Sequence, residues 1–231
     1  MNGLTHGVGA LLLYFLIAAG IALACRATIR IPDELFRKIL HCILLGSLPV
    51  FLFAFRIWWA AALTAVGFAV VVYPILAFFE RFRGFSQLTT ERKHGELKAS
   101  LLLVFGMFAC VIAVCWGWLG DRYLALASIY AWGFGDAAAA LIGKRFGVHK
   151  IGKKSIEGSA AMFLTAFLSV LTILLMRGGM SLLRCILVAL GTAAVSAETE
   201  LYSKNGMDTV ICPLSSMVVL IPLVYLAGGL A

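Results

Sequence analysis

The sequence predicts an all-α membrane protein, a polytopic bundle of about eight transmembrane helices with both termini outside. Of its 231 residues, 62% are hydrophobic and only 13% are charged. The mean hydropathy of +1.01 is far above that of a soluble domain. Apolar windows long enough to cross a bilayer, which takes about 20 residues, recur along the chain, and the basic residues between them alternate in number.

Eight windows account for most of the sequence. They are residues 8–27, 39–56, 57–79, 99–119, 122–142, 158–176, 185–200 and 209–229. The first has no basic leader and no convincing cleavage site, and seven more follow it, so we expect a retained helix and not a signal peptide. Because the sequence shows no internal repeat, low-complexity tract or linker, we expect one integral-membrane domain over residues 1–231.

The basic residues predict the orientation. Fifteen of the nineteen Lys and Arg residues lie in the first, third, fifth and seventh connections, and the other four are Arg56, Arg122, Arg177 and Arg184. By the positive-inside bias, the odd-numbered connections face the cytoplasm. We therefore attribute the net charge of +8 to membrane orientation, and we predict no nucleic-acid and no protein partner. The six cysteines show no metal-ligand spacing and are interpreted as small core residues.

The fifth window carries a single acid, Asp136, in the run AWGFGDAAAALIGKRFG. It lies eight residues before Lys144, which is about 12 Å along a helix that rises 1.5 Å per residue. An ionisable residue inside a span is costly, and it indicates function unless it forms a structural ion pair or a helix cap. We therefore predict that Asp136 is a site residue on the cytoplasmic half of the membrane.

The next connection, KRFGVHKIGKKSIEGSA, combines basic residues with glycines and leads to Ser155 and Glu157. Glycines allow backbone amides to approach an anion, a helix N-terminus adds partial positive charge, and basic side chains neutralise phosphoryl oxygens. A loop that contacts anionic lipid heads explains the charge but neither the glycines nor the acid. We predict a phosphate-binding loop without Walker spacing. Its candidate nucleotide contacts are Gly143, Lys144, Arg145, Gly147, Lys153, Lys154 and Ser155.

Two more charged clusters fall on the same predicted face. Helical spacing puts Arg37 and Lys38 on roughly the same side as His41. His41 is either a general base, a hydrogen-bond donor to a phosphate group, or a histidine at the membrane interface. Residues 89–100 (TTERKHGELKAS) are most simply a solvated charged loop.

A last cluster brings Glu200 to the end of the seventh window and Asp208 to the start of the eighth. Close carboxylates suit a divalent cation, and Mg²⁺ is usually held by few carboxylates together with substrate phosphates. With Asp136 and Glu157 these acids form a predicted metal-ligand set for Mg²⁺ or another divalent cation. Acids and basic groups on one face indicate phosphoryl transfer from a polyphosphate.

Three sequence motifs carry a family resemblance. The core motif, within residues 130–160, reads G-D-x-x-A from Gly135, G-K-x-F-G from Gly143 and K-S-x-E-G from Lys154. The outer motifs are R-K-x-x-H at residues 37–41 and E-x-x-S-x-x-G-x-D-x-x-x-x-P at residues 200–213. Together they resemble the polytopic CTP-dependent lipid kinases, a family that includes dolichol kinase, phytol kinase and CTP-dependent diacylglycerol kinases. One departure is Thr209, where the family often has Asn.

The resemblance implies that CTP donates the γ-phosphate to a lipid alcohol, which can be a polyprenol, phytol or diacylglycerol. It implies catalytic roles for Asp136, Glu157, Asp208 and His41, and it adds Arg37 and Lys38 to the nucleotide contacts. Which acid is the base and which is a metal ligand stays open. The implied location is a multi-pass protein of the membrane, the plasma membrane in a bacterium, with a cytoplasmic active site.

Other functions share part of these features. Phosphatidate cytidylyltransferase, which makes CDP-diacylglycerol, has a similar core motif, but its later Gly-His-Gly-Gly turn and its associated charged pairs are absent after residue 160. A small cation- or proton-coupled transporter explains Asp136 but not the basic loop or the late acids. A scaffold without chemistry would tolerate the loss of these acids.

Overall fold

The structure, a computed structural model, describes residues 2–79, 96–152, 154–203 and 207–229. Its helices are α1 (Asn2–Thr28), α2 (Asp33–Phe53), α3 (Trp58–Phe79), α5 (Glu96–Val111), the π-helix Ile112–Trp118, α6 (Arg122–Phe146), α7 (Ile156–Arg177), α8 (Leu182–Tyr202) and α9 (Asp208–Leu226). Within the described ranges, eight helical segments are long and apolar enough to cross a membrane. This confirms the predicted helical membrane bundle.

The chain divides into two compact units, unit 1 (Met1–Ala113) and unit 2 (Val114–Ala231). The predicted single domain over both units stays a prediction.

Unit 1 is held together by aromatic side chains. Phe51, Phe105 and Phe108 are fully buried, and the ring centroid of Phe105 lies 5.9 Å from that of Phe51 and 5.7 Å from that of Phe108. The Tyr14 hydroxyl donates to the Ile43 carbonyl oxygen at 2.7 Å and ties α1 to α2. Stacked and edge-on aromatic pairs of this kind add to the stabilisation that burial alone gives.

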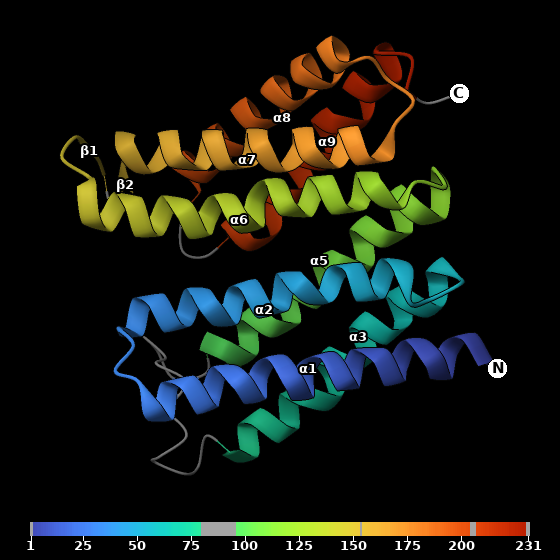
Figure 1. Ribbon diagram of the computed structural model, residues 1–231, viewed down its shortest axis with the longest axis vertical. Coiled ribbons are helices and arrows are strands. Elements are labelled where there is room, and N and C mark those ends of the chain that lie inside the picture. The colour runs from blue at the N-terminus through green and yellow to red at the C-terminus, as the bar shows by residue number, and fades with distance from the viewer. Residues whose placement is uncertain (1, 80–95, 153, 204–206, 230–231) are drawn as a thin grey trace. The chain divides into compact units, whose positions relative to one another are not determined.

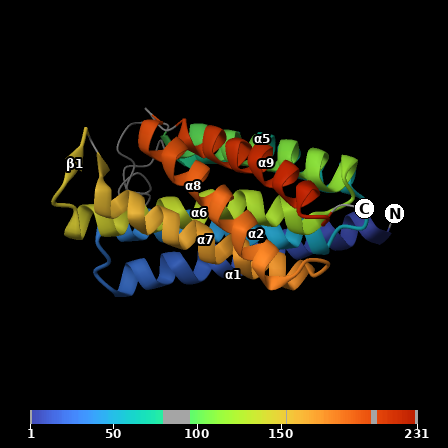
Figure 2. The ribbon, with the colours of Figure 1, turned by 90° about the horizontal axis from the view of Figure 1, so that it is seen from above.

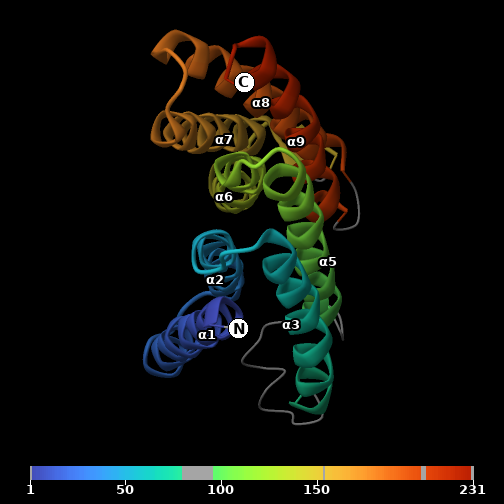
Figure 3. The same cartoon turned by 90° about the vertical axis from the view of Figure 1, so that its right-hand side faces the viewer.

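Unit 2 is a bundle of four helices. α6 packs on α7, α7 on α8, α8 on α9, and α9 returns to α6, with the α6–α7 contact the most extensive. Figures 1 and 2 show α6 beside α7, and Figure 3 views both nearly along their axes while α9 runs obliquely to them. Gly135 makes the α6–α7 approach possible, because a Cβ there would lie 2.3 Å from the sulfur of Met162. Small residues permit this close contact between membrane helices.

A short β-hairpin joins α6 to α7. Strand β1 (Lys150–Ile151) pairs antiparallel with β2 (Lys154–Ser155), and Gly152 takes a left-handed φ of 61° in the turn. α6 continues to Phe146, so Lys144 and Arg145 lie in its last turn and not in the loop expected from the sequence. Basic residues in a last turn are favoured by the helix dipole. We call this end of unit 2 the hairpin end.

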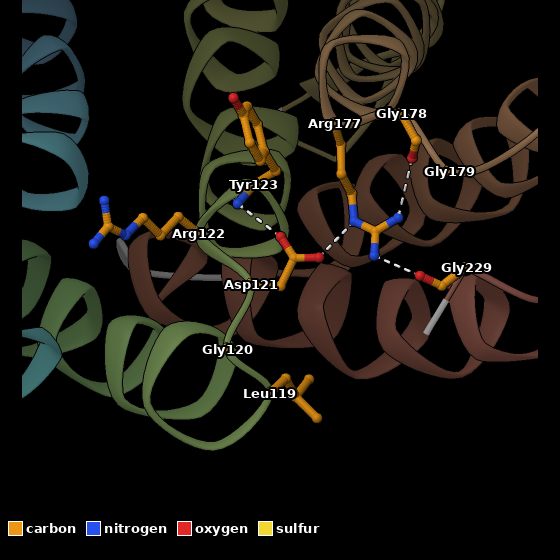
Figure 4. Close-up of a pocket in the computed structure, with 9 residues that line it drawn as sticks. All are labelled: Leu119, Gly120, Asp121, Arg122, Tyr123, Arg177, Gly178, Gly179 and Gly229. Atoms are coloured by element: carbon orange, nitrogen blue, oxygen red, sulfur yellow. Dashed lines mark hydrogen bonds and ion pairs between the residues drawn. The ribbon is translucent and has the colours of Figure 1, made fainter. Parts of the chain in front are cut away.

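The opposite end, called the Asp121 end, is tied by an ion-pair network (Figure 4). Asp121 Oδ1 accepts from the first amides of α6, those of Tyr123 and Leu124, at 2.9 and 3.2 Å. Its Oδ2 pairs with Nε of Arg177 at 2.5 Å, and Arg177 also donates to the carbonyl of Gly229. The network surrounds a depression of about 500 Å³. It joins the start of α6, the end of α7 and the segment after α9.

Candidate functional site

The hairpin end joins β2 to the end of α8 through Lys154. Its Nζ lies 2.8 Å from Oε1 of Glu200. The same ammonium donates to the backbone carbonyl of Glu200, and to Oγ of Ser203 at 3.3 Å. A lysine has three N–H donors, and these three acceptors engage all of them. Lys154 therefore fixes the position of Glu200 in this state.

Two further acids lie near this ion pair. The Glu200 side chain is almost fully buried, and Asp136 of α6, Asp208 of α9 and Lys154 are all near enough to interact with it electrostatically. The same four charged groups also act on the buried Cys212 of α9. The structure thus places two of the predicted metal ligands, Asp136 of α6 and Asp208 of α9, within electrostatic range of a third, Glu200 of α8.

Glu157, the fourth predicted ligand, contacts the hairpin instead. Its Oε1 accepts from the backbone amide of His149 at 3.1 Å and lies 2.8 Å from the Nδ1 of the same residue. Glu157 is in the first turn of α7, so the contact holds the hairpin against the helix start. A role in metal binding or catalysis stays a prediction for this residue.

The glycines around the loop are explained by packing. Ser155 caps α7, because its Oγ accepts from the amide of Gly158 at 3.1 Å. A Cβ on Gly147 would lie 2.2 Å from the carbonyl oxygen of Gly143 and 2.6 Å from the Ser155 hydroxyl. Gly143 and Gly147, the two predicted nucleotide-binding glycines, therefore lie where the end of α6 packs against the start of α7. A phosphate contact through their backbone stays a prediction.

The basic residues of the hairpin end form an exposed surface. Lys144, Arg145 and Lys150 are all exposed. The Arg145 guanidinium carbon lies 5.3 Å from the centroid of the Phe146 ring. Lys153, also a predicted nucleotide contact, lies outside the described residues. The surface carries the charge that binding an anion requires.

The predicted N-terminal motif lies in α2 of unit 1. Arg37 forms an ion pair with Glu34, one turn earlier. Lys38 is buried and His41 is half-buried. Their contribution to nucleotide binding or catalysis stays a prediction. Most of the charged cluster at residues 89–100, through residue 95, lies outside the described residues.

The predicted metal ligands do not form a metal cage from the described protein groups alone. In the part of the chain that the structure describes, no group of three or more His, Cys, Asp or Glu residues is close enough to form a metal cage by itself. Mg²⁺ is commonly bound by only one or two carboxylates, with phosphates and waters as its other ligands. Asp208 interacts electrostatically with Glu200, whose Oε1 contacts Lys154, and the binding of Mg²⁺ by these two carboxylates stays a prediction.

Two contacts of the hairpin end were not predicted from the sequence. His149 had no assigned role, although a reversal at Gly152 would return the chain from His149 to Glu157. Ser203 belongs to the C-terminal motif but had no predicted contact, and its bond with Lys154 depends on pairing residues 49 positions apart.

Comparison with known proteins identifies the family. Phytol kinase from Synechocystis sp. is 33% identical to this chain over 207 residues, which cover 81% of this chain and 78% of the relative. No family model matches the chain, and no solved structure matches it significantly. Eight apolar helices and this relative define a multi-pass membrane phosphotransferase that acts on a lipid alcohol. The chain belongs to the polytopic lipid kinase family that includes phytol kinase, which confirms the resemblance.

Proposed function

We propose that the protein transfers the γ-phosphate of CTP to the hydroxyl of a membrane-embedded lipid alcohol at the cytoplasmic face. The observation that carries the proposal is the grouping of Asp136 and Asp208 with the Lys154–Glu200 pair in a member of a lipid kinase family. Phytol is the acceptor named for the Synechocystis relative. A long isoprenoid alcohol of this class is therefore the first acceptor to test.

The charges at the two ends of unit 2 support a cytoplasmic hairpin end. Lys144, Arg145 and Lys150 are exposed there. At the other end Arg122 stacks on Trp116, with its guanidinium carbon 4.0 Å from the ring centroid, and Arg177 is paired with Asp121. The positive-inside bias then orients the hairpin end inward. With eight spans, both termini are outside.

The reaction would require a proton acceptor near the lipid hydroxyl. The hydroxyl oxygen attacks the γ-phosphorus, the bond from that phosphorus to the β–γ bridging oxygen breaks, and CDP leaves with the electron pair. The hydroxyl proton passes to a carboxylate. We assign this role to Asp136, because it lies well inside α6, whereas Glu200 is engaged by Lys154.

The basic groups have two different roles in this proposal. Lys144 and Arg145, which lie in the last turn of α6, neutralise the charge of the nucleotide phosphates. Lys154 acts as a positioning residue, since its three donors already hold Glu200 and Ser203. A bound Mg²⁺, with Asp208 and Glu200 as its candidate protein ligands, would supply further neutralisation of the transferring phosphoryl group.

Position-specific labels on CTP test the proposal. The purified protein in vesicles is given γ-labelled or α-labelled CTP with phytol, a polyprenol, diacylglycerol or phosphatidic acid. We expect γ-label, and no α-label, on one of the alcohols. Transfer of α-label to phosphatidic acid would instead show a cytidylyltransferase. A faster transfer from γ-labelled ATP than from CTP would refute CTP as the donor.

A further inference from the structure

Two buried serines lie about one and two helical turns deeper than the acid on the same helix, which is Glu200 of α8 or Asp208 of α9. Ser196 of α8 precedes Glu200 by four residues, and Ser216 of α9 follows Cys212 by four and Asp208 by eight. Residues spaced by four share one face of a helix. Each serine therefore lies on the helix face that carries an acid of the site, about 6 Å or more further into the bundle.

The two serines lie at nearly the same depth. Oγ of Ser215 donates to Oγ1 of Thr199 at 3.1 Å, which fixes the register of antiparallel α8 and α9. Counted inward from this contact, Ser196 is three residues along α8 and Ser216 is one residue along α9. With a rise of 1.5 Å per residue, their depths differ by about 3 Å. They form one polar layer beneath Glu200 and Asp208.

Their hydroxyls have no hydrogen-bond partner among the described residues. Both serines are 0% exposed and both oxygens are buried. Neighbouring hydroxyls on the same two helices behave differently, because Thr192 and Thr199 of α8 each donate to a carbonyl four residues earlier, at 2.9 and 2.7 Å, and Ser215 of α9 donates to Thr199. Such back-bonding is the usual arrangement for a hydroxyl within a helix. A buried hydroxyl without a hydrogen-bond partner is energetically unfavourable, and a bound polar group would relieve this cost.

We propose that Ser196 and Ser216 bind the hydroxyl of the lipid acceptor and present it to the acids of the hairpin end. This rests on the proposed function. A lipid alcohol has a single polar end, which must reach the carboxylates while its tail stays in apolar surroundings. A layer of hydroxyls between the acids and the apolar interior suits this end, since a hydroxyl both donates and accepts hydrogen bonds.

The test compares Ser196→Ala, Ser216→Ala and the double variant in the full-length protein, with phytol and CTP as the probes. We expect the KM for phytol to rise about tenfold in the double variant, the effect of losing one or two hydrogen bonds. The KM for CTP should stay within about twofold, because the phosphates bind to other residues. Thr192→Val and Ser128→Ala serve as controls, since both hydroxyls are buried and back-bonded.

A second readout needs no turnover. Phytol alone should raise the Tm of the wild type and of both controls, and this shift should be lost in the double variant. If the double variant keeps the KM for phytol and the phytol-induced rise in Tm, the proposal is overturned and water is the partner of the two serine hydroxyls. A wild type that phosphorylates no alcohol refutes the proposed kinase function alone, provided that phytol still stabilises it through these serines. A wild type that phytol does not stabilise overturns the acceptor site.

Discussion

The Lys154–Glu200 pair allows the structural role of a site residue to be separated from its chemical role. Lys154→Met removes the cation and keeps most of the apolar length. The Glu200 side chain is only 8% exposed and that of Lys154 26%, so the variant leaves a buried carboxylate without its partner. Breaking a buried pair costs about 3–5 kcal/mol. Because Lys154 is partly exposed, we expect about 3 kcal/mol, or roughly a hundredfold in the folding equilibrium.

Glu200→Gln in the same chain provides the matched second change. Replacing both members of a buried pair is often close to neutral, so Lys154→Met/Glu200→Gln should recover most of the lost stability. Phosphoryl transfer should remain low in the double variant, since the carboxylate of Glu200 is still missing. The three variants form a double-mutant cycle that isolates the coupling between the two side chains.

The assay is reversible unfolding of the protein in mixed micelles, followed by tryptophan fluorescence, with initial rates measured on the same preparations. A Lys154→Met variant as stable as the wild type would refute the ion pair as a structural contact. A double variant that regains full activity would show that Glu200 supports folding and not chemistry.

Three further changes test the packing of unit 2 by the same unfolding assay. Gly147→Ala should lower the free energy of unfolding by about 1–3 kcal/mol, because its Cβ would lie 2.2 Å from a carbonyl oxygen of the preceding turn. Gly106→Ala is the control and should be neutral or slightly stabilising, because its Cβ would have nothing within 4 Å. Equal changes in stability for the two variants would refute the packing explanation. Ser155→Ala should cost about 1 kcal/mol through loss of the α7 cap, and no loss would show that the cap is dispensable. Arg177→Gln should lower stability by about 3 kcal/mol, since it leaves Asp121 without its cation; a neutral result would remove this ion pair from the account.

Most of the fold follows from the sequence, because one physical rule dominates it. A helix that crosses hydrocarbon must satisfy its own backbone, so long apolar windows predict spans with little ambiguity. The predicted fifth window ended at residue 142 and the helix continues to Phe146. Hydropathy does not detect this last turn, since Lys144 and Arg145 are polar yet favoured at a helix C-terminus.

The candidate site could be predicted only in part. Acids and basic residues at one end of the spans indicated Asp136, Glu200 and Asp208, and the structure places Asp136 and Asp208 within electrostatic range of Glu200. The sequence could not show that Glu157 pairs with His149. The hairpin between them has strands of only two residues each, which are too short to give a recognisable hydrophobic pattern. The contact of Lys154 with Glu200, 46 residues away, depends on tertiary packing.

The most direct measurement of the central claim is the initial rate of γ-label transfer from CTP to phytol by Asp136→Asn. Asp33→Asn is the matched control, since Asp33 is a largely exposed acid at the start of α2 that forms an ion pair with Arg26. We expect the Asp136 variant to lose at least about a hundredfold in rate and the Asp33 variant to stay within about twofold, the small effect usual for an exposed pair. An Asp136→Asn protein that is folded and transfers phosphate at the wild-type rate would contradict the account.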